Sequence, residues 1–168
     1  MEKEKFLFAA AAALAPLREV RDLLPGNKRR PADVFLCNWA GGLDAALDVT
    51  FTQPSKMPIV YRAGAAATPG HALTQMFNNK CRVTEDLCRE QGIAFVPIVA
   101  ESLGGWHKVA LEQFRKLGSA LARHTGQDEG EKTGHLVKRA SILLQKGLAA
   151  MVLNRIPGHP NPVIDGQE

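Results

Sequence analysis

Residues 71–99 read HALTQMFNNKCRVTEDLCREQGIAFVPIV, and a glycine near the end divides them into two patterns. Before Gly92, apolar side chains recur at helical spacing, which predicts a helix over residues 71–90. After Gly92, residues 93–99 form a short apolar run, which is typical of a strand buried inside a core. A helix followed at once by a buried strand is typical of α/β folds.

Two more strands are expected upstream of this unit. Residues 34–37 and residues 46–51 are both apolar and short, and residues 39–42 between them contain two glycines that favour a turn. Together these segments predict a hairpin. The long segment over residues 53–70 is rich in proline, glycine and small residues, so it is expected to be irregular.

Helices are expected to cover the sheet. Helical patterns extend over residues 4–24, 106–124 and 131–154, and prolines and glycines separate them from their neighbours. The sequence therefore predicts an α/β fold in which a small mixed β-sheet is flanked by helices.

Length and composition favour one domain. The chain has 168 residues and is 45% hydrophobic, which is enough for one substantial core. We expect a single domain over residues 1–155 and an irregular tail over residues 156–168. Its three cysteines form no C-x-x-C pair, and this pattern favours an intracellular protein over a disulfide scaffold.

The first fifteen residues admit two interpretations. Lysines followed by an apolar run with small residues resemble a secretory signal, whereas the glutamates at Glu2 and Glu4 and the proline at Pro16 favour a packed helix. Nowhere does the sequence contain the long apolar run that a membrane span requires, so no membrane partner is expected.

Asp33 and Asp48 are the first candidate functional pair. Asp33 stands at the entrance of the first predicted strand and Asp48 inside the second, so the hairpin can bring the two carboxylates together. Asp48 lies between Leu47 and Val49, and a charge in an apolar strand is costly unless it is paired or bound to metal. Asp48 therefore needs a partner.

Lys80 is the candidate partner. It lies seven residues from both Leu73 and Leu87, so on a helix the three side chains share one face. Because that face is expected to pack on the sheet, the Lys80 ammonium should point toward the strands. The alternative is a lysine that lies along apolar surface and reaches water at the helix edge.

The order of these motifs resembles the restriction-like endonuclease domain of non-LTR, reverse-transcriptase-bearing mobile elements, a branch of the PD-(D/E)xK superfamily. The matching segments are Arg30-Pro31-Ala32-Asp33, then Asp48-Val49-Thr50, then Lys80 on the following helix, and finally Val96-Pro97-Ile98-Val99 and Gly104-Gly105-Trp106. The resemblance implies a restriction-endonuclease-like α/β fold and metal-dependent hydrolysis of DNA phosphodiester bonds.

The resemblance also implies roles for individual residues. Asp33 and Asp48, with the backbone carbonyl of Val49, would hold magnesium or manganese, and Lys80 would complete the catalytic set. Magnesium prefers a few carboxylate oxygens and keeps its waters, which agrees with this assignment.

The basic run Lys28, Arg29 and Arg30 is expected to contact DNA phosphates. The parent protein is expected to carry a reverse-transcriptase module, and the location is expected to be nuclear if the source is eukaryotic.

Two departures from the family pattern open an alternative. Thr50 stands where the superfamily places its lysine, so activity requires Lys80, or Lys56 in the loop, in that role. The cysteine-histidine zinc motif that usually precedes this nuclease is also missing. The alternative is a catalytically inactive remnant that binds nucleic acid or another partner.

Overall fold

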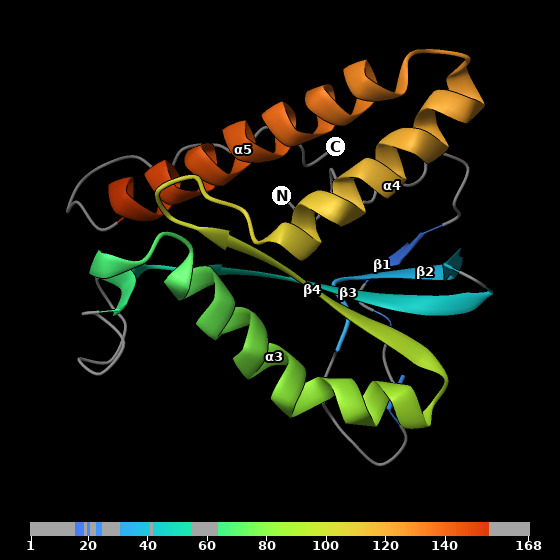
Figure 1. The fold of residues 1–168 in the computed structure, drawn as a ribbon, viewed down its shortest axis with the longest axis horizontal. Helices are drawn as coiled ribbons and strands as arrows, with labels where there is room; N and C mark the ends of the chain where they lie inside the picture. Colours follow the sequence, from blue (N-terminus) through green and yellow to red (C-terminus); the bar gives the residue numbers. More distant parts are fainter. Residues whose placement is uncertain are drawn as a thin grey trace.

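The computed structural model describes residues 16–18, 20, 23–24, 31–40, 42–54 and 64–154. Within these ranges one mixed sheet, with strand order β1-β2-β3-β4, is flanked by helices (Figure 1). The elements are β1 (Leu17–Arg18), β2 (Val34–Ala40), β3 (Leu43–Thr52), α3 (His71–Glu90), β4 (Ile93–Glu101), α4 (Lys108–Thr125) and α5 (Glu129–Leu153). The predicted α/β fold with a small mixed sheet and flanking helices is therefore confirmed.

The sheet combines a hairpin with a parallel pair. β2 and β3 form the predicted antiparallel hairpin, in which Val34 lies opposite Leu47. β4 runs parallel to β3 on the other side, with Pro97 opposite Asp48. Parallel neighbours cannot be joined by a tight turn, so the chain crosses from β3 to β4 through α3.

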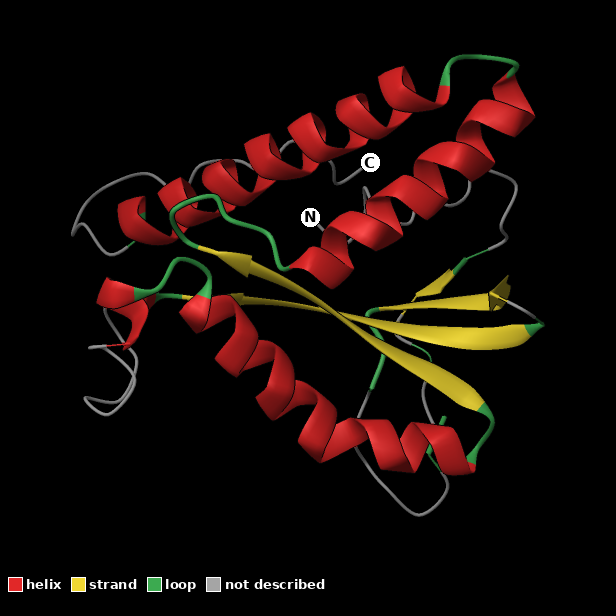
Figure 2. Cartoon of the chain, viewed as in Figure 1, coloured by secondary structure: helices red, strands yellow, loops and turns green. Residues whose placement is uncertain are grey.

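The alternation of side chains along the strands builds two cores. On one face Ala46 of β3 packs with Cys88 of α3, and on the other face Leu47 packs with Phe114 of α4. Figure 2 shows α3 on one side of the sheet and α4 and α5 on the other. Because successive strand residues point to opposite faces, Asp48 shares the α3 face with Ala46.

α4 and α5 form an antiparallel layer over the second face (Figure 1). Gly118 of α4 lies so close to Thr133 of α5 that a Cβ added at Gly118 would come within 3.0 Å of the Thr133 backbone nitrogen. The indole N–H of Trp106, just before α4, donates to the Ser141 hydroxyl of α5 at 3.0 Å. These contacts attach α5 to the rest of the domain.

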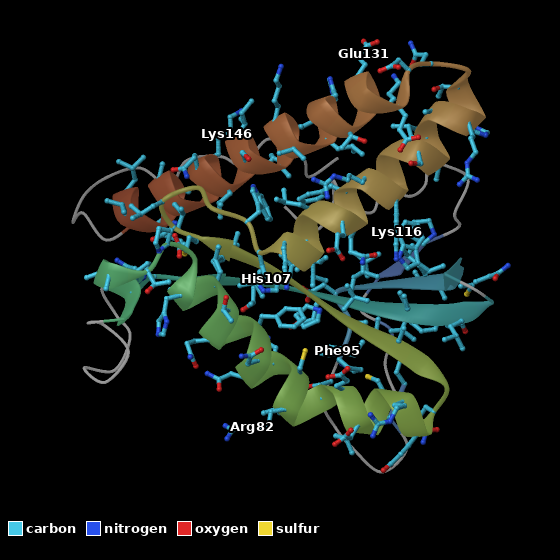
Figure 3. The ribbon with its side chains drawn as sticks, viewed as in Figure 1. Arg82, Phe95, His107, Lys116, Glu131 and Lys146 are labelled. Carbon is cyan, nitrogen blue, oxygen red and sulfur yellow. The ribbon has the colours of Figure 1, made fainter. Side chains whose placement is uncertain are left out.

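Positive charge is concentrated in this α4–α5 layer. Residues 108–153 contain eight lysines and arginines and four acids, whereas α3 carries three of each. Three of the four acids, Asp128, Glu129 and Glu131, lie at the start of α5, where acids suit the helix N-terminus. Figure 3 shows Lys146 and Glu131 on the side of α5 that faces away from the sheet.

The predicted element boundaries hold for the second half of the chain and fail in the first. α3, α4 and α5 begin and end within two residues of the predicted helices, and β2, β3 and β4 are longer than the predicted strands. The predicted helix over residues 4–24 is wrong at Leu17 and Arg18, which form β1 and pair with β2. The free edge of β2 offers backbone hydrogen bonds, and such tertiary pairing overrides local helical propensity.

Smaller differences occur in the predicted turn and loop. Trp39 and Ala40 belong to β2 although the sequence predicts a turn over residues 39–42, and residues 64–67 form a helical turn inside the predicted irregular segment. Residues 4–15 and the predicted tail over residues 156–168 lie outside the described ranges. Among the described residues, no helix is both long enough and apolar enough to cross a membrane.

Candidate active site

The carboxylate of Asp33 is fixed against β3. Asp33 stands one residue before β2, and its backbone N–H donates to the carbonyl of Leu47 at 2.9 Å. The backbone N–H of Val49 in turn donates to Oδ2 of Asp33 at 2.6 Å. These two bonds hold the Asp33 carboxylate beside the backbone at Asp48 and Val49.

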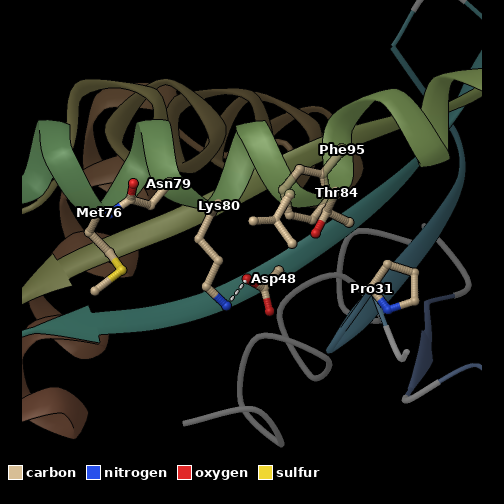
Figure 4. A pocket seen from close by; sticks show the side chains of 8 residues that line it. Pro31, Asp48, Met76, Asn79, Lys80, Thr84 and Phe95 are labelled. Atoms are coloured by element: carbon tan, nitrogen blue, oxygen red, sulfur yellow. Dashed lines mark ion pairs between the residues drawn. The ribbon is translucent and has the colours of Figure 1, made fainter. Parts of the chain in front are cut away.

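Asp48 and Lys80 form an ion pair beneath α3. Nζ of Lys80 lies 2.7 Å from Oδ2 of Asp48, and the two side chains are 33% and 15% exposed (Figure 4). Lys80 therefore lies on the inward face of α3, as its spacing predicts, because its ammonium points to the strand that carries Asp48. The flanking residues Leu73 and Leu87 also pack inward, one buried and the other half-buried.

An open cleft of about 480 Å³ lies beside this pair. It is bounded by the segment before β2, by β3 and β4, and by α3, and its lining residues are Pro31, Asp48, Met76, Asn79, Lys80, Val83, Thr84 and Phe95 (Figure 4). Half of these side chains are apolar, so charges at the cleft wall interact more strongly than they would in bulk water. Asp48 and Lys80 are the charged groups that line it.

The protein supplies only part of the ligand shell that a magnesium ion would need at this site. Among the described residues no three His, Cys, Asp or Glu side chains gather into a metal-binding group. Asp33 and Asp48 supply two carboxylates, and magnesium in proteins is often held by one or two carboxylates with water and substrate oxygens completing its shell. Two carboxylates are therefore a donor set that magnesium accepts.

The structure thus brings Asp48 and Lys80 together and bonds Asp33 to the backbone of Val49, the residue after Asp48. The role predicted for Val49 stays a prediction. The structure uses the Val49 N–H to bind Asp33, and the expected ligand is its carbonyl. Lys28, Arg29 and Arg30, together with the fallback candidate Lys56, lie outside the described residues.

Sequence reasoning missed Thr84 and Asn79 as neighbours of the site. Thr84 lies four residues after Lys80, one helical turn along α3, and Figure 4 shows both side chains on the same side of that helix. The spacing was the available signal, since residues at i and i+4 lie one above the other. Asn79 carried no such signal.

The chain was also compared with known proteins. No protein-family model, curated protein or solved structure matches it.

Proposed function

We propose that the chain is a metal-dependent DNA endonuclease with a restriction-endonuclease-like fold. The observation that carries the proposal is the ion pair at the cleft, in which Lys80 Nζ of α3 lies 2.7 Å from Asp48 Oδ2 of β3. Asp33, bonded to the backbone N–H of Val49, would supply the second carboxylate. A partly buried carboxylate that has a lysine partner and faces a cleft is typical of a functional site.

The reaction would be hydrolysis of a phosphodiester. The oxygen of a water molecule bonds to phosphorus, the bond from phosphorus to one bridging oxygen breaks, and that oxygen leaves as an alcohol after taking a proton. Magnesium, when bound, would lower the pKa of its water and offset negative charge on the phosphate. The carboxylates of Asp33 and Asp48 would hold the ion.

Lys80 would act on the substrate itself. Its side chain is one third exposed at the cleft, so the ammonium can turn from Asp48 to a phosphate oxygen when substrate enters. A cation at that position stabilises the negative charge that grows on the phosphate oxygens as water attacks. The Asp33–Val49 hydrogen bond would keep one carboxylate fixed while Lys80 changes partner.

Cleavage of supercoiled plasmid tests this proposal. The chain should nick plasmid with magnesium and not with EDTA, and Asp48→Asn and Lys80→Ala should each slow nicking by about a hundredfold or more. Arg89→Ala is the matched control, because Arg89 lies on the same helix in an exposed pair with Asp86. Equal rates for the chain and both site variants would reject the nuclease.

A second candidate function is binding of nucleic acid without cleavage. It is favoured by the distribution of charge. The positive excess lies on α4 and α5, whereas Lys80 lies on α3 and Asp48 on the strand face beneath it, on the opposite side of the sheet. An inactive remnant of the fold would bind DNA through the basic layer in a salt-dependent way. This candidate predicts binding that Asp48→Asn leaves unchanged, with no nicking.

A further inference from the structure

The chain leaves the parallel pair β3–β4 toward opposite faces of the sheet. After β3 it leads to α3 on one face, and after β4 it leads to α4 on the other (Figure 2). The carboxyl ends of the two strands lie together, with Thr52 opposite Glu101. In open α/β sheets, ligands bind outside the carboxyl ends of strands at the point where the connections diverge in this way.

A second cavity lies at this end of the sheet. Its volume is about 430 Å³, which is in the range of small-molecule sites. It is lined by the first two turns of α3 and by the start of α4: Pro69, Gly70, Leu73, Thr74, Phe77, Asn78, Trp106, His107, Lys108 and Val109. None of these residues lines the Asp48 cleft, so the two cavities are separate.

Backbone donors of α3 remain open at this cavity. Gly70 caps α3 without a side-chain hydrogen bond. The N–H groups of His71 and Thr74 donate to the carbonyls of Thr68 and Gly70 at 3.1 and 3.0 Å. The N–H of Leu73 has no partner in the described part of the chain. Free N–H groups in the first turn of a helix favour a bound anion.

His107 is an independent observation that points to a ligand. Its side chain is 6% exposed and lines the cavity. Nδ1 accepts a hydrogen bond from the Val109 N–H at 3.4 Å, and the ring stacks on Phe77 with centroids 4.2 Å apart. Figure 3 shows His107 between α4 and α3.

The protonation of His107 follows from these contacts. Burial lowers the pKa of His107 below its usual 6.5, so the ring is neutral at neutral pH. In a neutral ring whose Nδ1 accepts a hydrogen bond, the proton sits on Nε2. The Nε2–H group has no partner among the described residues and is not fully buried, so it is one donor open to the cavity.

We propose that this cavity binds the phosphate group of a small ligand of about nucleotide size. The Leu73 N–H, the Nε2–H of His107 and the ammonium of Lys108 would hold the phosphate. A phosphate group has more acceptor oxygens than a carboxylate, so it can use all three donors at once. The apolar walls at Phe77 and Trp106 suit the remainder of the ligand. This site does not depend on the proposed nuclease.

Titration of the whole isotope-labelled chain with inorganic phosphate, followed by NMR without added metal, tests the site. Saturable shifts are expected at the Leu73 and Lys108 amides and at Nε2 of His107. Lys108→Ala, and His107→Phe, which keeps the ring stack, should each weaken binding by about tenfold. Lys116→Ala removes the same charge from the same helix, at a position that does not line the cavity, and should change nothing.

Each alternative result overturns the proposal in a different way. An absence of saturable shifts in the high millimolar range would remove the site, and an equal loss of affinity in Lys116→Ala would reduce it to general attraction by a basic helix. Acetate binding as tight as phosphate binding would reject the phosphate assignment. Because neither metal nor cleavage is involved, failure here leaves the test of Asp48 and Lys80 unaffected.

Discussion

At the scale of single residues, the site depends on how a strand tolerates Asp48. Its carboxylate is only 15% exposed, and Lys80 supplies the opposite charge at 2.7 Å. A long lysine side chain can move its ammonium to water, whereas an aspartate in a strand cannot follow. Removing the lysine should therefore lower the free energy of unfolding more than removing the aspartate charge does.

A double-mutant cycle measures this asymmetry. Lys80→Met is expected to lower the free energy of unfolding by about 1–3 kcal/mol because it leaves a partly buried carboxylate uncompensated. Asp48→Asn should lower the free energy of unfolding by less than Lys80→Met does. The loss in the double variant should be smaller than the sum of the two single losses by about 1 kcal/mol or more. Urea denaturation provides the four values.

An exposed ion pair on the same helix is the reference for this cycle. Arg89 Nη2 lies 2.5 Å from Asp86 Oδ1, and both side chains are more than 70% exposed. Arg89→Ala should change the free energy of unfolding by less than about 1 kcal/mol because water screens the pair. Additive effects at Lys80 and Asp48, or an Arg89 effect as large as theirs, would contradict the assignment of a partly buried pair.

His107 should make stability depend on pH. Burial lowers its pKa in the folded chain, so between that pKa and 6.5 the unfolded chain binds more protons than the folded chain. The free energy of unfolding that this residue contributes is therefore full above 6.5 and decreases as pH falls through that window.

The difference in stability between the chain and His107→Phe isolates this contribution. Urea denaturation from about pH 5 to about pH 8 should show the chain losing stability toward low pH more steeply than the variant. Parallel curves would mean that His107 titrates alike in the folded and unfolded chains.

At the scale of elements, the layer of α4 and α5 depends on Gly118. A Cβ at this position would lie 3.0 Å from the Thr133 Cα and nitrogen, so the helices would have to move apart. Gly118→Ala is therefore expected to lower the free energy of unfolding by about 1–3 kcal/mol. Thermal and urea denaturation measure the change.

Gly147 provides the opposite case in the same layer. It lies in α5 with no atom within 4 Å of an added Cβ, so Gly147→Ala should raise the free energy of unfolding by about 0.5–1 kcal/mol through helix propensity alone. If both alanine variants stabilise the chain, the close approach of the two helices at Gly118 is wrong.

The elements also show what the sequence can and cannot predict. α3 and β4 are predictable because strong apolar patterns flank Gly92, and the inward face of Lys80 follows from its spacing to two leucines. β1 is not predictable from the sequence, because Leu17 and Arg18 become a strand only through their pairing with β2. The same limit applies to His107, whose stacking on Phe77 joins two helices that are distant in sequence.

At the scale of the whole molecule, the positive charge and the candidate active site lie on opposite faces of the sheet. α3 carries as many acids as bases, so it offers no net attraction to DNA, whereas α5 has no acid after Glu131. A DNA strand that reaches Asp48 needs cations elsewhere near the cleft, and Lys28, Arg29 and Arg30 come shortly before Pro31, which lines it.

Two charge-matched variants determine which face DNA uses. One replaces Lys28, Arg29 and Arg30 with alanine, and the other replaces Lys132, Lys138 and Lys146 of α5. Affinity for a short duplex is measured in EDTA over a range of salt concentrations. We expect the first variant to bind more weakly, with the slope of log K against log salt smaller by about one for each DNA phosphate that the variant no longer neutralises.

The opposite outcome is equally informative because both variants lose three positive charges. If the α5 variant loses affinity while the variant at residues 28–30 does not, DNA lies on the α4–α5 face, away from Asp48 and Lys80. A duplex held there cannot present a phosphodiester to the cleft on the α3 face. That result would support the binding-only function and make the Asp48–Lys80 pair a structural contact.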